Sequence, residues 1–316
     1  MADIDPAIVL KFLQANFHRD TASVQWIGSG WFSHAFSFTV GEQAFIFRVN
    51  SYLEDLQKDA FAYQHFVSAR LPIPRVVLLG QFDETHHFCI TERCSGQTLN
   101  DLDKAMVRKV VPRLFETLDA IHRVDVSDYT GWGLTDANGN GRFDSWTDYL
   151  LSLYNQKFMH RGSTLQQHAF WEKDVHEAFF EEMRRWLPYC SSNKYLIHRD
   201  YGFDNVMSDG QTITGVLDWA DCGLGDFVFD IAWLDFFSQE IPYGELWSDY
   251  AAAKGYNVPN LPERMRCYML WIGLDSMASV AVKENERSYL RHRERTRSVL
   301  LPGRRSDSDW THAASA

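Results

Sequence analysis

The chain lacks the features of membrane and secreted proteins. Its 316 residues contain no apolar run of about 18 residues, the length that a membrane-spanning helix needs. The start, Met1 to Pro6, has neither a basic head nor an apolar stretch, so we read no signal peptide there. The five cysteines form no C-x-x-C pair, and an odd, scattered set is typical of reduced thiols rather than of a disulfide framework. We therefore expect a cytoplasmic protein without a membrane segment.

Positive charge is also scarce. The chain has 31 Lys and Arg against 42 Asp and Glu, a formal net charge of −11, which disfavours nucleic acid as a partner because phosphate attraction requires basic surface. An acidic protein suits neutral or cationic partners instead. Residues 283–305 are the exception, with eight basic and three acidic side chains, and we interpret them as a solvated helix face.

The composition is that of a globular protein, with 45% hydrophobic and 15% aromatic residues. The length favours two domains, and no internal repeat is present. We predict an α+β fold of two lobes, a mostly β lobe over residues 1–95 and a mostly helical lobe over residues 96–316.

Hydrophobic periodicity divides the first lobe into short elements. A helix is expected from Asp5 or Pro6, with an apolar stripe that includes Ile8 and Phe12. Alternating or β-branched runs predict strands, and a helical pattern separates the third from the fourth. The expected strands are Val24–Ile27, Ala35–Val40, Ala44–Val49, Val76–Phe82 and His87–Glu92, and the expected helix is Lys58–Leu71.

The second lobe reads as helical with one β-like patch. We expect helices over Thr98–Leu102, Val107–Val124, Ser145–Phe158 and Trp171–Leu187, and again from about residue 220 to 300. Between them, the short apolar runs Tyr195–His198, Val206–Met207 and Thr212–Leu217 predict strands.

The most informative segment is His198-Arg199-Asp200-Tyr201-Gly202-Phe203-Asp204-Asn205, which is followed by Asp218 at the end of an apolar run. Phosphoryl transfer needs a carboxylate that orients and deprotonates a hydroxyl, and further oxygen ligands that hold Mg²⁺ on the phosphates. The spacing H-x-D-x-x-x-x-N is that of kinase catalytic loops. Taken alone, each of these acids is better explained as a residue that caps a turn or ends a strand. All of them together at this spacing favour a phosphotransferase site.

A nucleotide clamp should then lie near the N-terminus. Gly28, Ser29, Gly30 and Ser33 form a G-x-G-x-x-S turn, which is a weak signal because glycine turns are common in hairpins. No G-x-x-x-x-G-K-[ST] motif occurs, which excludes a Walker-type loop. The strand cation that should touch the phosphates is Arg48. Its partner on the following helix is Asp59, with Asp55 as a rival, and the alternative is an exposed surface pair.

Taken together, these motifs resemble the aminoglycoside phosphotransferase family, which has a protein-kinase-like fold. The stretches that carry the resemblance run in order along most of the chain: Ala35 to Phe38, Arg48 to Ser51, Leu71 to Pro74, Thr98 to Leu102, His198 to Asn205, Asp218-Trp219 and Ile272 to Asp275. Residues 125–190 are only loosely similar.

The resemblance implies Mg²⁺, a nucleoside triphosphate (ATP or GTP) as donor, and transfer to a hydroxyl of an aminoglycoside or aminocyclitol. It implies Asp200 as the base and Asn205 and Asp218 as metal ligands. It also implies purine binding by the backbone of a hinge that includes Glu92 and Cys94. Asp226 and Asp230 would be buried braces of the catalytic loop.

Some positions depart from the family pattern. Arg199 stands where the family usually has a small residue, and the absence of an Ala-Pro-Glu signature argues against a protein kinase. The residues that we expect to line an anionic acceptor site are Asp204, Asp221, Phe237, Glu240 and Asp275. Two alternatives remain open: a kinase of another small alcohol (an amino alcohol, a sugar or a macrolide), and a non-catalytic nucleotide- or ligand-binding protein.

Overall fold

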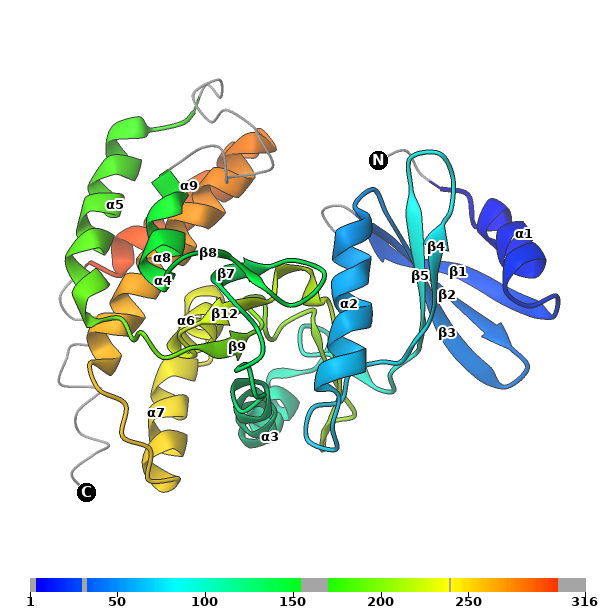
Figure 1. Ribbon diagram of the computed structural model, residues 1–316, viewed down its shortest axis with the longest axis horizontal. Coiled ribbons are helices and arrows are strands. Elements are labelled where there is room, and N and C mark those ends of the chain that lie inside the picture. Colours follow the sequence, from blue (N-terminus) through cyan, green and yellow to red (C-terminus); the bar gives the residue numbers. More distant parts are fainter. Residues whose placement is uncertain (1–3, 30–32, 155–169, 239, 301–316) are drawn as a thin grey trace. The chain divides into compact units, whose positions relative to one another are not determined.

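The structure is a computed structural model that describes residues 4–29, 33–154, 170–238 and 240–300 (Figure 1). The chain forms two compact units. The first unit comprises Met1–Ile121, Asp136–Gly139 and Gly202–Cys222, and the second comprises His122–Thr135, Asn140–Tyr201 and Gly223–Ala316. The division into lobes at residues 95 and 96 stays a prediction.

The first unit is built on an antiparallel sheet in the order β1-β2-β3-β5-β4. All five strands were expected from the sequence, and their centres agree. Their bounds are Thr21–Ser29 for β1, Ser33–Val40 for β2, Gln43–Asn50 for β3, Val76–Gln81 for β4 and His87–Glu92 for β5. The turn between β2 and β3 contains Gly41 at φ +59°, a left-handed conformation that glycine adopts readily.

The two faces of this sheet have different partners because side chains alternate along a strand. Phe45, Phe47 and Val49 of β3 pack in one core with Val9 and Leu13 of α1 (Pro6–Asn16). The Asp5 side chain accepts a hydrogen bond from the Ala7 N–H at 2.8 Å and so caps this helix, as expected. Ile8, which we placed in the apolar stripe, is 56% exposed instead.

The other face of the sheet meets α2 (Leu53–Phe66), on the opposite side from α1 (Figure 1). The helix begins and ends five residues earlier than the predicted span Lys58–Leu71. Residues 67–71 leave the helix at Val67, and Ser68 and Leu71 exchange backbone hydrogen bonds before the two prolines. The helix therefore ends before the segment that the prolines restrict.

A small sheet in the order β11-β10-β6 completes the first unit, with β6 at Gln97–Thr98, β10 at Val206–Ser208 and β11 at Ile213–Val216. The helix predicted over Thr98–Leu102 is wrong, because Thr98 pairs with Met207 of β10. Gly96 permits this close approach, since a Cβ there would lie 2.1 Å from the Ser208 carbonyl oxygen. Helix α3 follows at Lys104–His122.

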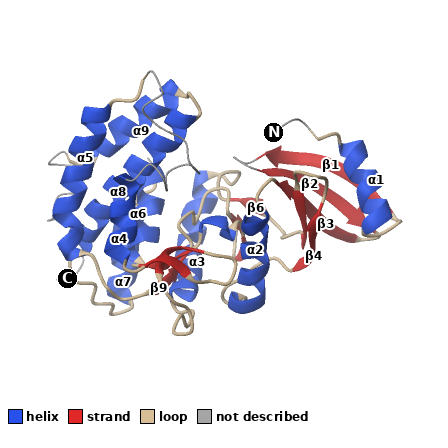
Figure 2. Ribbon diagram, turned by 45° about the horizontal axis from the view of Figure 1, so that its top comes forward, coloured by secondary structure: helices blue, strands red, loops and turns tan. Residues whose placement is uncertain are grey.

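The second unit is mainly helical (Figure 2). Its helices are α4 (Trp146–Leu151), α5 (Lys173–Trp186), α6 (Val228–Phe237), α7 (Tyr243–Ala253), α8 (Leu261–Val282) and α9 (Glu286–Ser298). Helix α8 is the centre of this bundle and packs against α5, α6 and α9. The predicted helix Ser145–Phe158 is shorter, since α4 passes into a 3₁₀ turn at Ser152–Tyr154, and residues 155–158 lie outside the described residues.

A four-stranded sheet in the order β8-β7-β12-β9 lies beside these helices. Of its strands, only β9 (Tyr195–Ile197) was expected. The others, β7 (Trp132–Thr135), β8 (Gly141–Phe143) and β12 (Gly223–Gly225), are short and rich in glycine. Gly225 is necessary where it stands, because a Cβ would lie 2.4 Å from the Trp146 ring.

Two expectations about the whole chain can be compared with the structure. Among the described residues, no helix has both the length and the apolar character to cross a membrane. The five cysteines all fall in the described part of the chain, and each is a free thiol, as their scattered spacing predicts.

Candidate active site

The predicted ion pair of the first unit is present. Arg48 on β3 points away from the α1 core and donates a hydrogen bond through Nη2 to Oδ2 of Asp59 on α2. The two side chains are 19% and 10% exposed, so the alternative of an exposed surface pair is wrong. Arg48 Nη1 also lies 3.8 Å from Asp218 Oδ1. One guanidinium therefore faces two carboxylates.

Burial and charge set the ionisation of this pair. Burial alone would lower the pKa of the Arg48 guanidinium, but Asp59 and Asp218 raise it above its ordinary value. Burial raises the pKa of the Asp59 carboxyl to about 6, and Arg48 and the Trp219 N–H oppose this rise. Burial and ion pairing therefore act in opposite directions on both members of the pair.

Strand pairing places Asn205 close to Asp218. Val206 of β10 pairs with Val216 of β11, and the Leu217 N–H donates to the Asn205 carbonyl oxygen at 2.8 Å. Because Leu217 is hydrogen-bonded to Asn205, the next residue, Asp218, begins beside Asn205. The backbone of Asp218 is left-handed, with φ +57°, a conformation that residues other than glycine seldom adopt and that often marks functional sites.

Hydrogen bonds attach the turn after Asp218 to α2. The Trp219 N–H donates to Asp59 Oδ1 at 2.8 Å, and the ammonium of Lys58 donates to the Ala220 carbonyl oxygen. Lys58 is only 5% exposed. Lys58 was not predicted from the sequence, because a lysine on a polar helix face is usually solvated. Its position next to Asp59 was the only available signal.

The predicted nucleotide loop is partly described. Gly28 and Ser29 end β1, Ser33 begins β2, and Gly30 lies outside the described residues. Gly28 pairs with Ala35 across the hairpin. A Cβ at Gly28 would meet nothing within 4 Å, so the space beside this backbone is open.

The predicted hinge follows β5. The Glu92 N–H donates to the Arg75 carbonyl oxygen at 3.0 Å, and the Arg93 N–H donates to the Ala44 carbonyl oxygen at 3.1 Å. Cys94 packs against Gly215 of β11, where a Cβ would lie only 2.5 Å from its sulfur. Burial raises the pKa of the Cys94 thiol to about 11, with Glu92 adding to the rise.

Asp200 belongs to the second unit, whereas Asn205 and Asp218 belong to the first. It follows β9, and one carboxylate holds the backbone before it. Asp230 of α6 accepts from the His198 N–H at 3.1 Å and from the Arg199 N–H at 2.8 Å. Asp230 is completely buried. The expectation that Asp230 braces the catalytic loop is confirmed.

Asp226 is likewise buried, but the expectation that it braces the catalytic loop is wrong, because its partners among the described residues lie elsewhere. It forms an ion pair with Arg264 of α8, and its Oδ2 accepts from the Tyr268 hydroxyl at 2.5 Å. Burial by itself would lower the pKa of the Arg264 guanidinium, and Asp226 raises it. Asp226 therefore attaches α8 to the start of α6.

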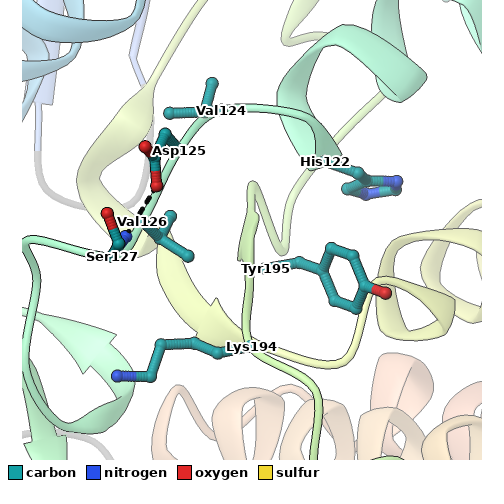
Figure 3. A pocket seen from close by; sticks show the side chains of 7 residues that line it. All are labelled: His122, Val124, Asp125, Val126, Ser127, Lys194 and Tyr195. Carbon is teal, nitrogen blue, oxygen red and sulfur yellow. Dashed lines mark hydrogen bonds between the residues drawn. The ribbon is translucent and has the colours of Figure 1, made fainter.

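A pocket of the second unit lies next to Asp230 (Figure 3). His122 and Tyr195 line one side, and the Ser127 N–H donates to Asp125 Oδ1 at 2.9 Å on the other. His122 Nε2 lies 2.9 Å from Asp230 Oδ2, so this histidine joins the pocket to the brace of the catalytic loop. None of the seven lining residues is among those predicted for the site.

The residues predicted to bind the acceptor are divided between the units. Asp204 and Asp221 are exposed residues of the first unit, and the Asn100 side-chain amide donates to Asp204 Oδ1 at 2.7 Å. Glu240 is exposed, and Asp275 is half-buried on α8. Phe237 ends α6 and packs against Trp233, with ring centroids 4.6 Å apart. That these side chains form one anionic site stays a prediction.

Comparisons with known proteins identify the family. The phosphotransferase enzyme family (APH) matches residues 23–268. The chain is 32% identical over 277 residues to the hygromycin-B 4-O-kinase of Escherichia coli, covering 88% of this chain and 80% of that protein.

Solved structures agree with the family match. The crystal structure of aminoglycoside phosphotransferase APH(4)-Ia superposes with a TM-score of 0.83 at 31% identity, over 93% of this chain and 98% of that one. A thermostable mutant of that enzyme, in a ternary complex with AMP-PNP and hygromycin B, gives 0.82 at 30% identity, over 92% and 97%. The GDP complex of aminoglycoside 2′-phosphotransferase-IIIa, 14% identical with a TM-score of 0.68 over 94% and 98%, shares the fold.

The protein-kinase-like α+β fold expected from the motifs is thus confirmed, as is the expectation of a phosphotransferase with an alcohol group as acceptor. With a family match over most of its length, the chain belongs to the aminoglycoside phosphotransferase family.

Proposed function

We propose that the protein transfers the γ-phosphoryl group of a nucleoside triphosphate to a hydroxyl of an aminoglycoside or aminocyclitol of the hygromycin type, and that it confers resistance in this way. The observation that carries the proposal is the buried Arg48–Asp59 pair beside Asp218 in the first unit. It combines with the intact catalytic motif of Asp200 and Asn205 in a chain similar to a hygromycin-B kinase.

The nucleotide would bind to the first unit. Arg48 offers a fork of donors to phosphate oxygens, and Asp59 holds that fork in place. The phosphates would lie against the turn that contains Gly28, Ser29, Gly30 and Ser33. The N–H groups of Glu92 and Arg93 already donate to backbone carbonyls, so we propose that Cys94, rather than either of them, offers its N–H to the purine, whether adenine or guanine.

Mg²⁺ fits the donor set in this unit. Asn205 offers an amide oxygen, and Asp218 offers a carboxylate that is 44% exposed; these are the oxygen ligands that Mg²⁺ takes together with phosphates. Within the described residues, no group of three His, Cys, Asp or Glu side chains could hold a metal by itself, which suits an ion bound partly by phosphate. When bound, Mg²⁺ would neutralise charge on the transferred group.

Asp200 would orient the acceptor hydroxyl and take its proton as the hydroxyl oxygen bonds to the γ-phosphorus and the nucleoside diphosphate leaves. Only five positions separate Asp200 from Asn205 in the chain. A side chain that acts on the proton matters more for turnover than for binding. We expect Asp200→Asn to lower kcat by on the order of 10²–10⁴, with little change in nucleotide affinity. Near-normal turnover of this variant would remove Asp200 from the role.

The acceptor is identified with purified protein, Mg²⁺ and either ATP or GTP. The panel contains hygromycin B, other aminoglycosides, an amino alcohol, a neutral sugar and a macrolide, with Asp200→Asn as the inactive control. We expect turnover of a polycationic acceptor. Preference for a neutral alcohol would favour the small-alcohol kinase. Nucleotide binding without turnover of any acceptor would favour a non-catalytic binding protein.

The anionic acceptor site has its own test. Asp204→Asn and Glu240→Gln should each raise KM for a cationic acceptor more than tenfold, because a hydrogen bond to a charged group contributes roughly 1.5–3 kcal/mol. KM for the nucleotide should hardly change. Glu84→Gln, an exposed acid on the loop between β4 and β5, is the matched control. If that control shifts KM equally, the effect is one of overall charge rather than of a site.

A further inference from the structure

Arg199, the residue before Asp200, has an unusual backbone. Its φ is +68°, in the left-handed region where a Cβ is unfavourable and glycine is the default. Arginine at such a position persists only where its surroundings hold it. The backbone that leads into it is fixed, since the His198 and Arg199 N–H groups both donate to Asp230.

The side chain of Arg199 occupies an aromatic cage formed by Tyr149, Phe229 and Trp271. Its Cζ lies 5.2 Å, 5.5 Å and 5.4 Å from the centroids of these three rings, which come from α4, α6 and α8. The rings also contact one another, with centroids 5.3 Å apart for Tyr149–Trp271 and for Phe229–Trp271. A cation over several ring faces is attracted by their quadrupoles, most strongly where water is excluded.

The cage is closed. Arg199 is 6% exposed, so its guanidinium is not presented to a phosphate group at the surface. Gly223 of β12 leaves room for its stem, because a Cβ there would lie 3.1 Å from Arg199 Cδ and 2.8 Å from the Gly133 carbonyl oxygen. Three helices and one strand thus converge on a side chain that adjoins the proposed base.

We infer that Arg199 is a positioning residue for Asp200. The cage holds the guanidinium, the guanidinium holds the left-handed backbone, and that backbone directs the Asp200 carboxylate. The inference rests on the proposed function, in which Asp200 takes the proton. It assigns the cage a role in turnover and none in substrate binding.

The kinetic test compares Arg199→Met, Arg199→Gly and Arg199→Lys with the parent. Met keeps the bulk but loses the charge, Gly relaxes the backbone but empties the cage, and Lys keeps the charge. We expect kcat to fall at least tenfold for Met and Gly, with both KM values within twofold of the parent, and to stay within about fivefold for Lys. A space-filling role predicts a normal kcat for Met. A kcat within threefold for Met, a Lys variant no better than Met, or a change confined to KM would each overturn the inference.

Two further measurements keep the test decisive. If Arg199→Met does not fold, Tyr149→Leu, which removes one ring of the cage, replaces it under the same criteria. If the parent phosphorylates no acceptor, the proposed function has failed, and amide hydrogen exchange judges the positioning role. The His198 and Arg199 amides should then exchange at least tenfold faster in Arg199→Met, with Ile231 of α6 unchanged. The same change in exchange rate at all three amides, or no change at any of them, would overturn the inference.

Discussion

Replacing Lys58 by Met tests whether α2 controls the turn after Asp218, the proposed metal ligand. The Lys58 ammonium donates to the Ala220 carbonyl oxygen, two residues after Asp218, and the side chain is 5% exposed. Met has a similar length and fills the same space without the charge. The turn would then keep the hydrogen bond from the Trp219 N–H to Asp59.

The size of the effect follows from the lost contact. A hydrogen bond that involves a charged group contributes about 1.5–3 kcal/mol, and every 1.4 kcal/mol is tenfold in an equilibrium constant. If this bond holds Asp218 in its left-handed conformation, the Kd for Mg-nucleotide should rise between about tenfold and a hundredfold. Affinity for the nucleotide without Mg²⁺ should change little, because Arg48 keeps Asp59 as its partner.

Calorimetric titration with nucleotide, once in excess Mg²⁺ and once in a chelator, separates the two affinities. Lys11→Met provides the control, since Lys11 is an exposed lysine of α1. Thermal unfolding establishes that each variant is folded. A folded Lys58→Met protein with Mg-nucleotide affinity within twofold of the parent would refute the reasoning, as would an equal loss in the presence of the chelator.

Two other predictions concern packing and pH. Gly215→Ala should raise KM for the nucleotide and lower the unfolding free energy by about 1–3 kcal/mol, because the new methyl group overpacks against Cys94. Adding Cys94→Ala should remove most of this loss of stability. If the effects of the two substitutions on stability are additive, the contact is contradicted. Burial lowers the pKa of His176 to about 4 from 6.5, and its Nε2 has no partner among the described residues. Because the unfolded chain binds the proton more tightly, the unfolding free energy should fall as the pH drops below 6.5, by about 2 kcal/mol between pH 7 and pH 5. Denaturant titrations should show a smaller fall for His176→Phe, and an equal fall would show that other groups cause it.

Some parts of the molecule were determined by the sequence alone. The aromatic and β-branched residues of Ala44–Val49 predicted β3 and identified Arg48 as the only cation of that strand. Asp59 could then be predicted as its partner, because a short helix follows and only a few acids are within reach. The spacing from Asp200 through Asn205 to Asp218 likewise predicted a phosphotransferase, since phosphoryl transfer uses these residue types; the roles of the three residues stay a prediction.

Only the tertiary structure decided the features that depend on distant segments. Strands of two to four residues such as β6 and β12 carry too little periodicity to be detected, and they exist because β10 and β9 pair with them. The burial of Lys58 depends on the turn at Ala220, which lies 162 positions away in the chain. The conformation of Arg199 depends on rings from three helices. A local pattern reports which residues can form an element, whereas the free energy of burying a charge or straining a backbone is set by neighbours that only the folded chain brings together.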